Sequence, residues 1–175
     1  MRNYVLLGVL LIGGMFLHGS SNPSDPELKK VIQVAFVCRD VEATSKRWAA
    51  VLGVDPPKIW LTHPGPEVKM IYRGKPSNGR AKIAIINAGQ VDLEFLEPVG
   101  ENSSWKDYLD TKGEGVQHIA FRVQDVAKAT NFFQKMGMGV VHQGRFDDDD
   151  GSYTYIDSRD QLLVNVELLH DDPKK

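Results

Sequence analysis

The stretch that decides the fold is Gly115-Val116-Gln117-His118-Ile119-Ala120-Phe121-Arg122-Val123-Gln124-Asp125-Val126. Its β-branched and aromatic residues are typical of a strand, and the strand carries a histidine and runs directly into a helix. The same pattern occurs in Val31-Ile32-Gln33-Val34-Ala35-Phe36-Val37-Cys38-Arg39-Asp40-Val41, at a constant offset of 85 residues. One such unit cannot bury its own apolar face, so the duplication predicts two copies packed together. The matched positions Gln33 and His118 are then brought to one shared centre.

The composition places the chain among ordinary globular proteins. Its 175 residues are 42% hydrophobic and 25% charged, which is enough for one domain with its own core. The net charge is −2 and the lysines and arginines are scattered, so no nucleic-acid partner is expected. Cys38 is the only cysteine, which excludes an intramolecular disulfide and a metal site built from several thiolates.

The N-terminus has the pattern of a secretory signal. Arg2 is followed by an apolar run over residues 4–17 and then by the small residues Gly19-Ser20-Ser21. The apolar run is short for a membrane span. We therefore expect residues 1–21 to be a signal peptide, residues 22–30 to be a linker, and the mature chain to be exported to the periplasm or secreted. The alternative is an uncleaved segment that anchors the chain in the membrane through residues 4–17.

The repeated unit also sets the order of elements that we expect. Each copy begins with a strand, and Asp40 and Asp125 are placed to cap the following helix. Three further strands in each copy give a βαβββ order, hence an α+β fold, with Pro98 breaking the last strand of the first copy. The expected boundaries are residues 31–98 for the first module, 99–115 for a linking helix, 116–170 for the second module and 171–175 for a tail.

Four residues at corresponding positions of the two copies are candidate metal ligands. Gln33 and His118 lie on the two first strands, and Glu94 and Glu167 lie on the two last strands. Taken singly, a strand histidine is more often structural and a strand glutamate is usually solvated. Together, two carboxylates, one imidazole and one amide oxygen suit a six-coordinate divalent cation that keeps positions open for substrate oxygens.

The chain resembles the vicinal oxygen chelate superfamily, which includes glyoxalase I, methylmalonyl-CoA epimerase, extradiol dioxygenases and bleomycin-resistance proteins. The resemblance covers residues 31–170 and is locally closest to the epimerases. It is carried by Asp92-Leu93-Glu94-Phe95-Leu96-Glu97-Pro98, Ser103-Ser104-Trp105-Lys106-Asp107-Tyr108-Leu109, Lys112-Gly113-Glu114-Gly115-Val116-Gln117-His118-Ile119-Ala120-Phe121 and Val164-Asn165-Val166-Glu167-Leu168. It implies that the two modules form one shared curved mixed sheet around a metal cleft.

The ligand set departs from the epimerase pattern. Epimerases usually have histidine at the first ligand position, where this chain has Gln33. The order Gln, Glu, His, Glu is similar to that of animal-type glyoxalase I. However, Val37 and Pro98 stand where that enzyme has its glutathione-anchoring Arg and Asn. The resemblance therefore implies the fold and the metal without naming the substrate.

The function that the resemblance implies is a lyase or isomerase of the glyoxalase or epimerase type. It would bind one divalent ion (Zn, Ni, Co or Mn) through Gln33, Glu94, His118 and Glu167, and would act on a small carbonyl substrate through a metal-stabilised enolate. Glu167 is the expected base, with Glu94 as the alternative, and a homodimer is an expected assembly. The other candidate functions are non-catalytic binding, as in bleomycin resistance, and a metal-dependent dioxygenase.

A few other residues have a weaker claim on the site. Arg122 lies four residues after His118 on the same strand face, so it could bind an anionic substrate group or could equally reach solvent. His63 and His142 are expected at the surface. The acidic turn at residues 147–150 is expected to be solvated, with a calcium site as the less favoured interpretation.

Overall fold

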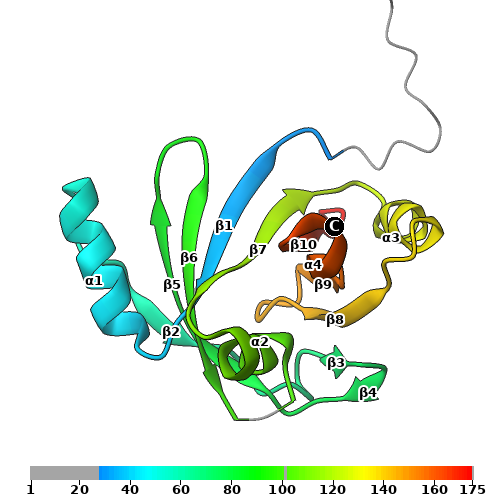
Figure 1. Ribbon diagram of the computed structural model, residues 1–175, viewed down its shortest axis with the longest axis horizontal. Helices are drawn as coiled ribbons and strands as arrows, with labels where there is room; N and C mark the ends of the chain where they lie inside the picture. The colour runs from blue at the N-terminus through cyan, green and yellow to red at the C-terminus, as the bar shows by residue number, and fades with distance from the viewer. Residues whose placement is uncertain (1–27, 101, 175) are drawn as a thin grey trace, which may run out of the picture.

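The computed structural model describes residues 28–100 and 102–174 (Figure 1). The expected signal peptide and residues 22–27 of the expected linker lie outside these residues. Within them, no helix has the length and apolarity needed to span a membrane.

The described part of the chain folds into one sheet with helices around it. The strands are β1 (Val31–Val37), β2 (Ile59–Leu61), β3 (Ile71–Tyr72), β4 (Lys75–Pro76), β5 (Arg80–Asn87), β6 (Asp92–Val99), β7 (Gly115–Arg122), β8 (Val140–Arg145), β9 (Gly151–Ile156) and β10 (Asn165–Asp171). The helices are α1 (Val41–Leu52), α2 (Ser104–Lys112), α3 (Val126–Lys135) and α4 (Arg159–Leu162).

The sheet confirms the predicted duplication. Its strand order is β2-β5-β6-β1-β7-β10-β9-β8-β3-β4, so each module contributes four neighbouring strands. In both modules the first strand is parallel to the last, as β1 is to β6 and β7 is to β10. The modules join where β1 pairs with β7 in antiparallel fashion, which makes the sheet mixed. Figure 1 shows the sheet curling around its concave face. The predicted α+β fold with a shared curved mixed sheet is therefore confirmed.

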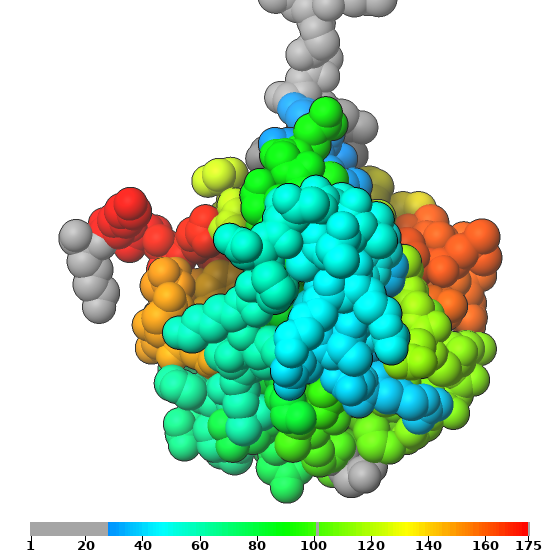
Figure 2. Space-filling view, turned by 90° about the vertical axis from the view of Figure 1, so that its left-hand side faces the viewer, coloured from blue at the N-terminus to red at the C-terminus, as the bar shows by residue number. Residues whose placement is uncertain are grey.

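Helices α1 and α3 begin where the sequence predicts. The Asp40 carboxylate accepts a hydrogen bond from the Ala43 amide at 2.8 Å, and Asp125 accepts one from the Lys128 amide at 2.9 Å. Each helix packs on the convex side of its own module, as Figure 2 shows for α1. Under α1 the rings of Phe36, Trp48 and Phe95 lie together, and the buried Cys38 is a small core residue beside them.

Helix α2 and a hairpin inserted in the first module complete the core on the concave side. The hairpin β3–β4 pairs with β8 of the second module, so the insertion crosses from one copy to the other. Trp105 and Leu109 of α2 pack in one buried cluster with Leu96 of β6 and Tyr155 of β9. This cluster underlies the cavity described below.

One predicted strand end is wrong. Strand β6 continues through Pro98 to Val99, although Pro98 was expected to break it. The pairing of β6 with β1 ends at Leu96, so beyond that residue β6 has a neighbour only in β5. A proline is tolerated there because no second neighbour needs its missing amide hydrogen.

Candidate active site

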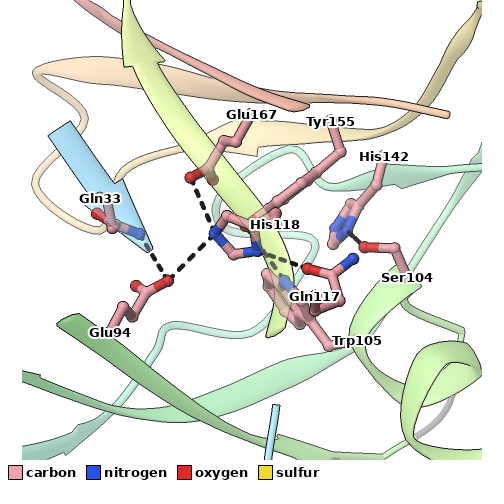
Figure 3. A network of polar contacts seen from close by, with 9 residues as sticks. All are labelled: Gln33, Glu94, Ser104, Trp105, Gln117, His118, His142, Tyr155 and Glu167. Atoms are coloured by element: carbon pink, nitrogen blue, oxygen red, sulfur yellow. Dashed lines mark hydrogen bonds and ion pairs between the residues drawn. The ribbon is translucent and has the colours of Figure 1, made fainter. Parts of the chain in front are cut away.

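The sheet register brings the four predicted ligands to the middle of the concave face. Ala35 is paired with Glu94 on one side and with His118 on the other. Ala120 is paired in the same way with Gln33 and Glu167. Both alanines are completely buried. Because their side chains are single methyl groups, the four longer side chains beside them can lean over this point and meet (Figure 3).

The four side chains are in direct contact. His118 Nε2 lies 3.1 Å from Glu167 Oε2 and 3.4 Å from Glu94 Oε2. The Gln33 amide donates a hydrogen bond to Glu94 Oε2 at 2.7 Å. Glu94, His118 and Glu167 are all buried, with at most 8% of any of them exposed. The convergence expected from the symmetry of the sequence is therefore what the structure contains.

The electrostatics of this group favour a positive charge at its centre. Burial alone would lower the pKa of His118, but the Glu167 and Glu94 carboxylates outweigh burial and raise that pKa to about 9. Burial raises the pKa of Glu94, and its contact with His118 opposes that rise. A proton on His118 supplies one positive charge between the carboxylates. A divalent cation is the alternative, and it would displace that proton.

A bulge directly before His118 adds a residue that period-two reasoning missed. The pairing of β1 with β7 shifts between Ala35–His118 and Phe36–Val116, which leaves Gln117 as the extra residue. Alternation would place Gln117 on the opposite face, yet its Oε1 lies 2.5 Å from His118 Nδ1. With Nδ1 donating to this amide oxygen, Nε2 is the ring nitrogen that faces the two carboxylates, and loss of its proton would leave a lone pair there for a metal ion. The equivalent shift in β1 leaves Ile32, directly before Gln33, as its extra residue.

The donor set fits a divalent metal ion in its chemistry. Consider two ligand atoms that each lie about 2.0–2.2 Å from the same ion. They are about 3.0 Å from each other when their bonds to the ion form a right angle, and about 3.4 Å apart when the coordination is tetrahedral. The contacts of His118 with the two carboxylates are in this range. Apart from the ion-pair contacts around His118, its Nε2 and Glu167 Oε2 are buried and have no hydrogen-bond partner among the described residues. Half a turn of the Gln33 amide would present its oxygen instead of its nitrogen. Across residues 28–100 and 102–174, however, no three His, Cys, Asp or Glu side chains are spaced as a ready-made metal centre.

A cavity of about 470 Å³ opens onto this group, with Gln33, Glu94 and Glu167 in its wall. Its size is in the range of small-molecule sites, about 300–1,000 Å³. Tyr153 and Tyr155 line it as well, and a Cβ atom at Gly144 would collide with the ring of Tyr153. Most of the remaining wall is apolar and comes from both modules: Trp60, Val68, Met70, Ile83, Ile85, Leu96, Phe146 and Leu169.

His142 corrects one expectation, because it is fully buried rather than at the surface. Its ring lies 5.2 Å from the ring of Tyr155, stacked on it, and 4.7 Å from Trp105 at a steep angle. Ser104 Oγ lies 2.9 Å from its Nδ1. Burial, followed by the charge of His118, lowers the pKa of His142 to about 3. His142 is therefore a neutral member of the wall behind Tyr155, not a ligand.

This burial should make the protein sensitive to mild acid. The unfolded chain protonates His142 below its ordinary pKa of about 6.5, whereas the folded protein resists until about pH 3. The contribution of neutral His142 to the free energy of unfolding is therefore fully present above pH 6.5. It is lost by about 1.4 kcal/mol for each pH unit as the pH falls from 6.5 toward 3. In urea unfolding between pH 6.5 and 4.5, His142→Phe should show a shallower decline than the wild type by up to that slope. Parallel declines would contradict this.

Two other predicted features lie away from the centre. Arg122 is not among the residues that line the cavity; its guanidinium pairs with Asp171 and its side chain is 46% exposed. The last β1–β7 pair is Val31 with Phe121, so Arg122 extends past the end of that pairing toward solvent. Its expected role in substrate binding is therefore not supported. His63 is exposed, as expected, and lines the cavity at its outer part.

Comparison with known proteins agrees with this arrangement. The sequence profile of the Glyoxalase/Bleomycin resistance protein/Dioxygenase superfamily matches residues 32–155. No curated protein matches the chain. A methylmalonyl-CoA epimerase from Mycobacterium tuberculosis is similar in fold, with 19% identity, a TM-score of 0.56, and 83% of this chain and 90% of that chain covered.

Two further solved structures reach 25% identity, each covering 83% of this chain and 99% of the other. One is a Streptomyces coelicolor methylmalonyl-CoA epimerase variant in complex with 2-nitronate-propionyl-CoA, with a TM-score of 0.58. The other is a methylmalonyl-CoA epimerase in complex with methylmalonyl-CoA and NH4+, with a TM-score of 0.57. The superfamily profile covers well over half of the chain, and the fold and the twofold arrangement of the site accord with it. The chain therefore belongs to the Glyoxalase/Bleomycin resistance protein/Dioxygenase superfamily.

Proposed function

We propose that this protein is a metal-dependent lyase or isomerase of the glyoxalase or epimerase type, acting on a small carbonyl compound. The observation that carries the proposal is the buried imidazole of His118 in contact with two carboxylates at a cavity of about 470 Å³. Burying two carboxylates and an imidazole together is costly unless they hold a charge between them. A site built for passive binding of an apolar molecule has no need of such a group.

Gln33, Glu94, His118 and Glu167 would hold the ion. A set of one nitrogen and three oxygen donors suits zinc, nickel, cobalt or manganese. A bound ion would supply Lewis acidity toward a carbonyl oxygen, which makes the hydrogen on the adjacent carbon more acidic. A dioxygenase centre favours two histidines with one carboxylate, whereas this chain has Gln33 where a second histidine would stand.

Glu167 is the better candidate for the base that moves this proton. Glu94 Oε2 accepts a hydrogen bond from the Gln33 amide at 2.7 Å, which ties it to the neighbouring strand. Glu167 lies on the cavity wall, its Oε2 contacts His118 Nε2 at 3.1 Å, and it stands at the position that has this role in glyoxalase I, which the ligand set resembles. A carboxylate that faces the cavity beside the ion could both take a proton from the substrate and return it. Burial and the nearby carboxylates raise the pKa of Tyr155 well above its ordinary value, so this wall residue stays a neutral phenol.

The names of the relatives at 25% identity support the reaction class, because epimerisation removes and returns a proton next to a carbonyl group.

For the location, the pattern of residues 1–21 leads us to propose export from the cytoplasm. N-terminal sequencing of protein recovered from the producing cell tests this; an intact Met1 in a cytosolic fraction would refute it.

The proposed function is tested by metal analysis and proton exchange. The purified protein should contain close to one equivalent of a divalent metal. In deuterated water, the loaded protein should exchange the hydrogen next to the carbonyl in at least one neutral probe, such as dihydroxyacetone or a 2-methylacyl thioester of N-acetylcysteamine. Removing the ion with a chelator should stop the exchange. Protein that binds no metal, or whose exchange is unaffected by the chelator, would refute the proposal.

A further inference from the structure

The cavity has a charge pattern that bears on its substrate. Its wall is mainly apolar, and its inner polar groups are Gln33, Glu94 and Glu167. The turn between β8 and β9 adds Asp147, Asp148 and Asp150 to the same wall. Carboxylates therefore occur both at the candidate metal centre and on the outer part of the cavity. Glu167 on the same wall is 3% exposed and its Oε2 lies 3.1 Å from His118 Nε2, so the inner end of the cavity is polar and charged.

The carboxylates of the turn are held at the wall. Asp147 Oδ1 accepts a hydrogen bond from the His63 amide at 2.9 Å, which ties the turn to the segment after β2. Backbone hydrogen bonds link Arg145 to Val68 and Phe146 to Gly151. The crowding of carboxylates is visible in the pKa of Asp150, which its neighbour Asp148 raises. Their negative potential is thus a fixed property of the entrance.

The positive charge near the entrance is already engaged. Arg145 is the only lysine or arginine among the residues that the structure places on the cavity wall. Its Nε donates to Asp149 at 2.7 Å, and both of its terminal nitrogens contact Asp172. The charge of Lys69 also acts on Asp149. Arg145 is thus engaged by Asp149 and Asp172, whereas the three carboxylates of the wall have no ion pair among the described residues: Asp147, Asp148 and Asp150.

From this pattern we infer that the substrate is a small carbonyl compound with an apolar body and a neutral or cationic outer end. The inference rests on the proposed function, which places the carbonyl end at Glu94 and Glu167. The apolar wall receives the body, and the Asp147–Asp150 turn meets the outer end. Carriers with phosphates or carboxylates would bring several negative charges to this turn, where the described residues of the wall offer no free guanidinium or ammonium group to receive them.

The effect should be large enough to measure. One pair of charges about 8 Å apart in water changes a binding constant by roughly twofold. Three uncompensated carboxylates together change the binding constant of a singly charged ligand by roughly tenfold. A cation gains this factor and an anion loses it, so the difference between the two ligands is twice as large on a logarithmic scale. At 0.5 M salt the screening length falls to about 4 Å, so most of the difference should disappear.

A matched series of hydroxamates tests the inference, because a hydroxamate binds a metal ion through two oxygens whatever its tail. Binding of benzohydroxamate, 4-carboxybenzohydroxamate and 4-(aminomethyl)benzohydroxamate to the zinc-loaded full chain is measured by calorimetry at low salt. The aminomethyl compound should bind at least tenfold more tightly than the carboxy compound. In the variant Asp148→Asn/Asp150→Asn this ratio should fall by at least threefold. The control Asp55→Asn/Asp160→Asn makes the same change in net charge on exposed residues outside the wall, and should keep the ratio.

The outcomes separate this inference from the proposed function. If all three hydroxamates bind to the loaded protein with equal affinity, the inference about the substrate is wrong while the metal centre stands. If the carboxy compound binds most tightly, the inference is likewise wrong. If none binds, or if all bind equally well to metal-free protein, the proposed metal-dependent function itself fails. If the affinity ratio of the aminomethyl to the carboxy compound changes as much in the control as in the turn variant, the preference comes from the net charge of the protein. The role assigned to the turn would then be wrong.

Discussion

The variant His118→Ala should lose its divalent metal, with affinity falling by about 100-fold or more. Loss of an outer partner of a metal ligand alone costs about 10–100-fold, and His118 is the only nitrogen donor among the four residues proposed to hold the ion. Its Nε2 also contacts both carboxylates, so its removal leaves Glu94 and Glu167 without the group that lies between them. Metal content after dialysis against a weak chelator is the measurement.

Two further variants make this test specific. His142→Ala removes an imidazole that is equally buried but lies outside the ligand group, and it should keep the metal. Gln117→Leu leaves all four donors in place and removes the amide that fixes His118 Nδ1, so we expect a loss of about tenfold. Circular dichroism of each variant checks that it is folded. If His118→Ala and His142→Ala both retain a full equivalent of metal, the centre has been assigned to the wrong residues.

The variant Glu167→Gln should lose about 10²–10⁴-fold in turnover, which is the usual worth of a general base. Glutamine keeps the volume and an oxygen donor, so the metal should remain bound, although more weakly. Glu167 lies on the cavity wall beside His118, whereas Glu94 is held by Gln33. The measurement is proton exchange in deuterated water with metal content determined in parallel, on whichever neutral probe the wild-type protein exchanges.

The contrasting variant is Gln33→Glu. It turns an amide ligand of the first module into a carboxylate, whereas Glu167→Gln turns a carboxylate of the second module into an amide. Gln33→Glu adds a third carboxylate, so metal should bind more tightly while its pull on a substrate oxygen weakens. The expected order of turnover is wild type, then Gln33→Glu, then Glu167→Gln near background. If Glu167→Gln keeps both its metal and near-normal exchange, Glu167 is not the base, and Glu94 becomes the residue to test.

Much of this arrangement could be predicted because it follows from local rules. The constant spacing between Gln33 and His118 reveals the duplication, and alternation along a strand puts Ala35 on the same face as Gln33. The caps at Asp40 and Asp125 depend only on the first turn of each helix. These features need no knowledge of distant contacts, which is why the fold class and the meeting of the four candidate ligands were accessible from the sequence.

The features that could not be predicted depend on contacts between distant segments. Gln117 faces His118 only because the register slips by one residue against β1, and nothing in the order of residues marks that slip. His142 is buried because α2 and the crossing hairpin β3–β4 cover β8. Alternation along β7 predicts that Arg122 shares a face with His118, but Arg122 lies beyond Val31, the residue at which β1 begins. The position of the Asp147–Asp150 turn beside His63 is likewise a tertiary fact.

The junction of β1 with β7 has a consequence for how the two copies can diverge. A symmetric pair of separate single-module chains would have to place the same residue at both equivalent positions, since one gene would encode both. In one continuous chain each copy can mutate alone, as Ile32 and Gln33 differ from Gln117 and His118. The glutamates of the two copies are thereby unequal, because Glu94 accepts a hydrogen bond from the Gln33 amide while Glu167 lies closer to His118. One continuous chain therefore allows two residues at equivalent positions to take different roles.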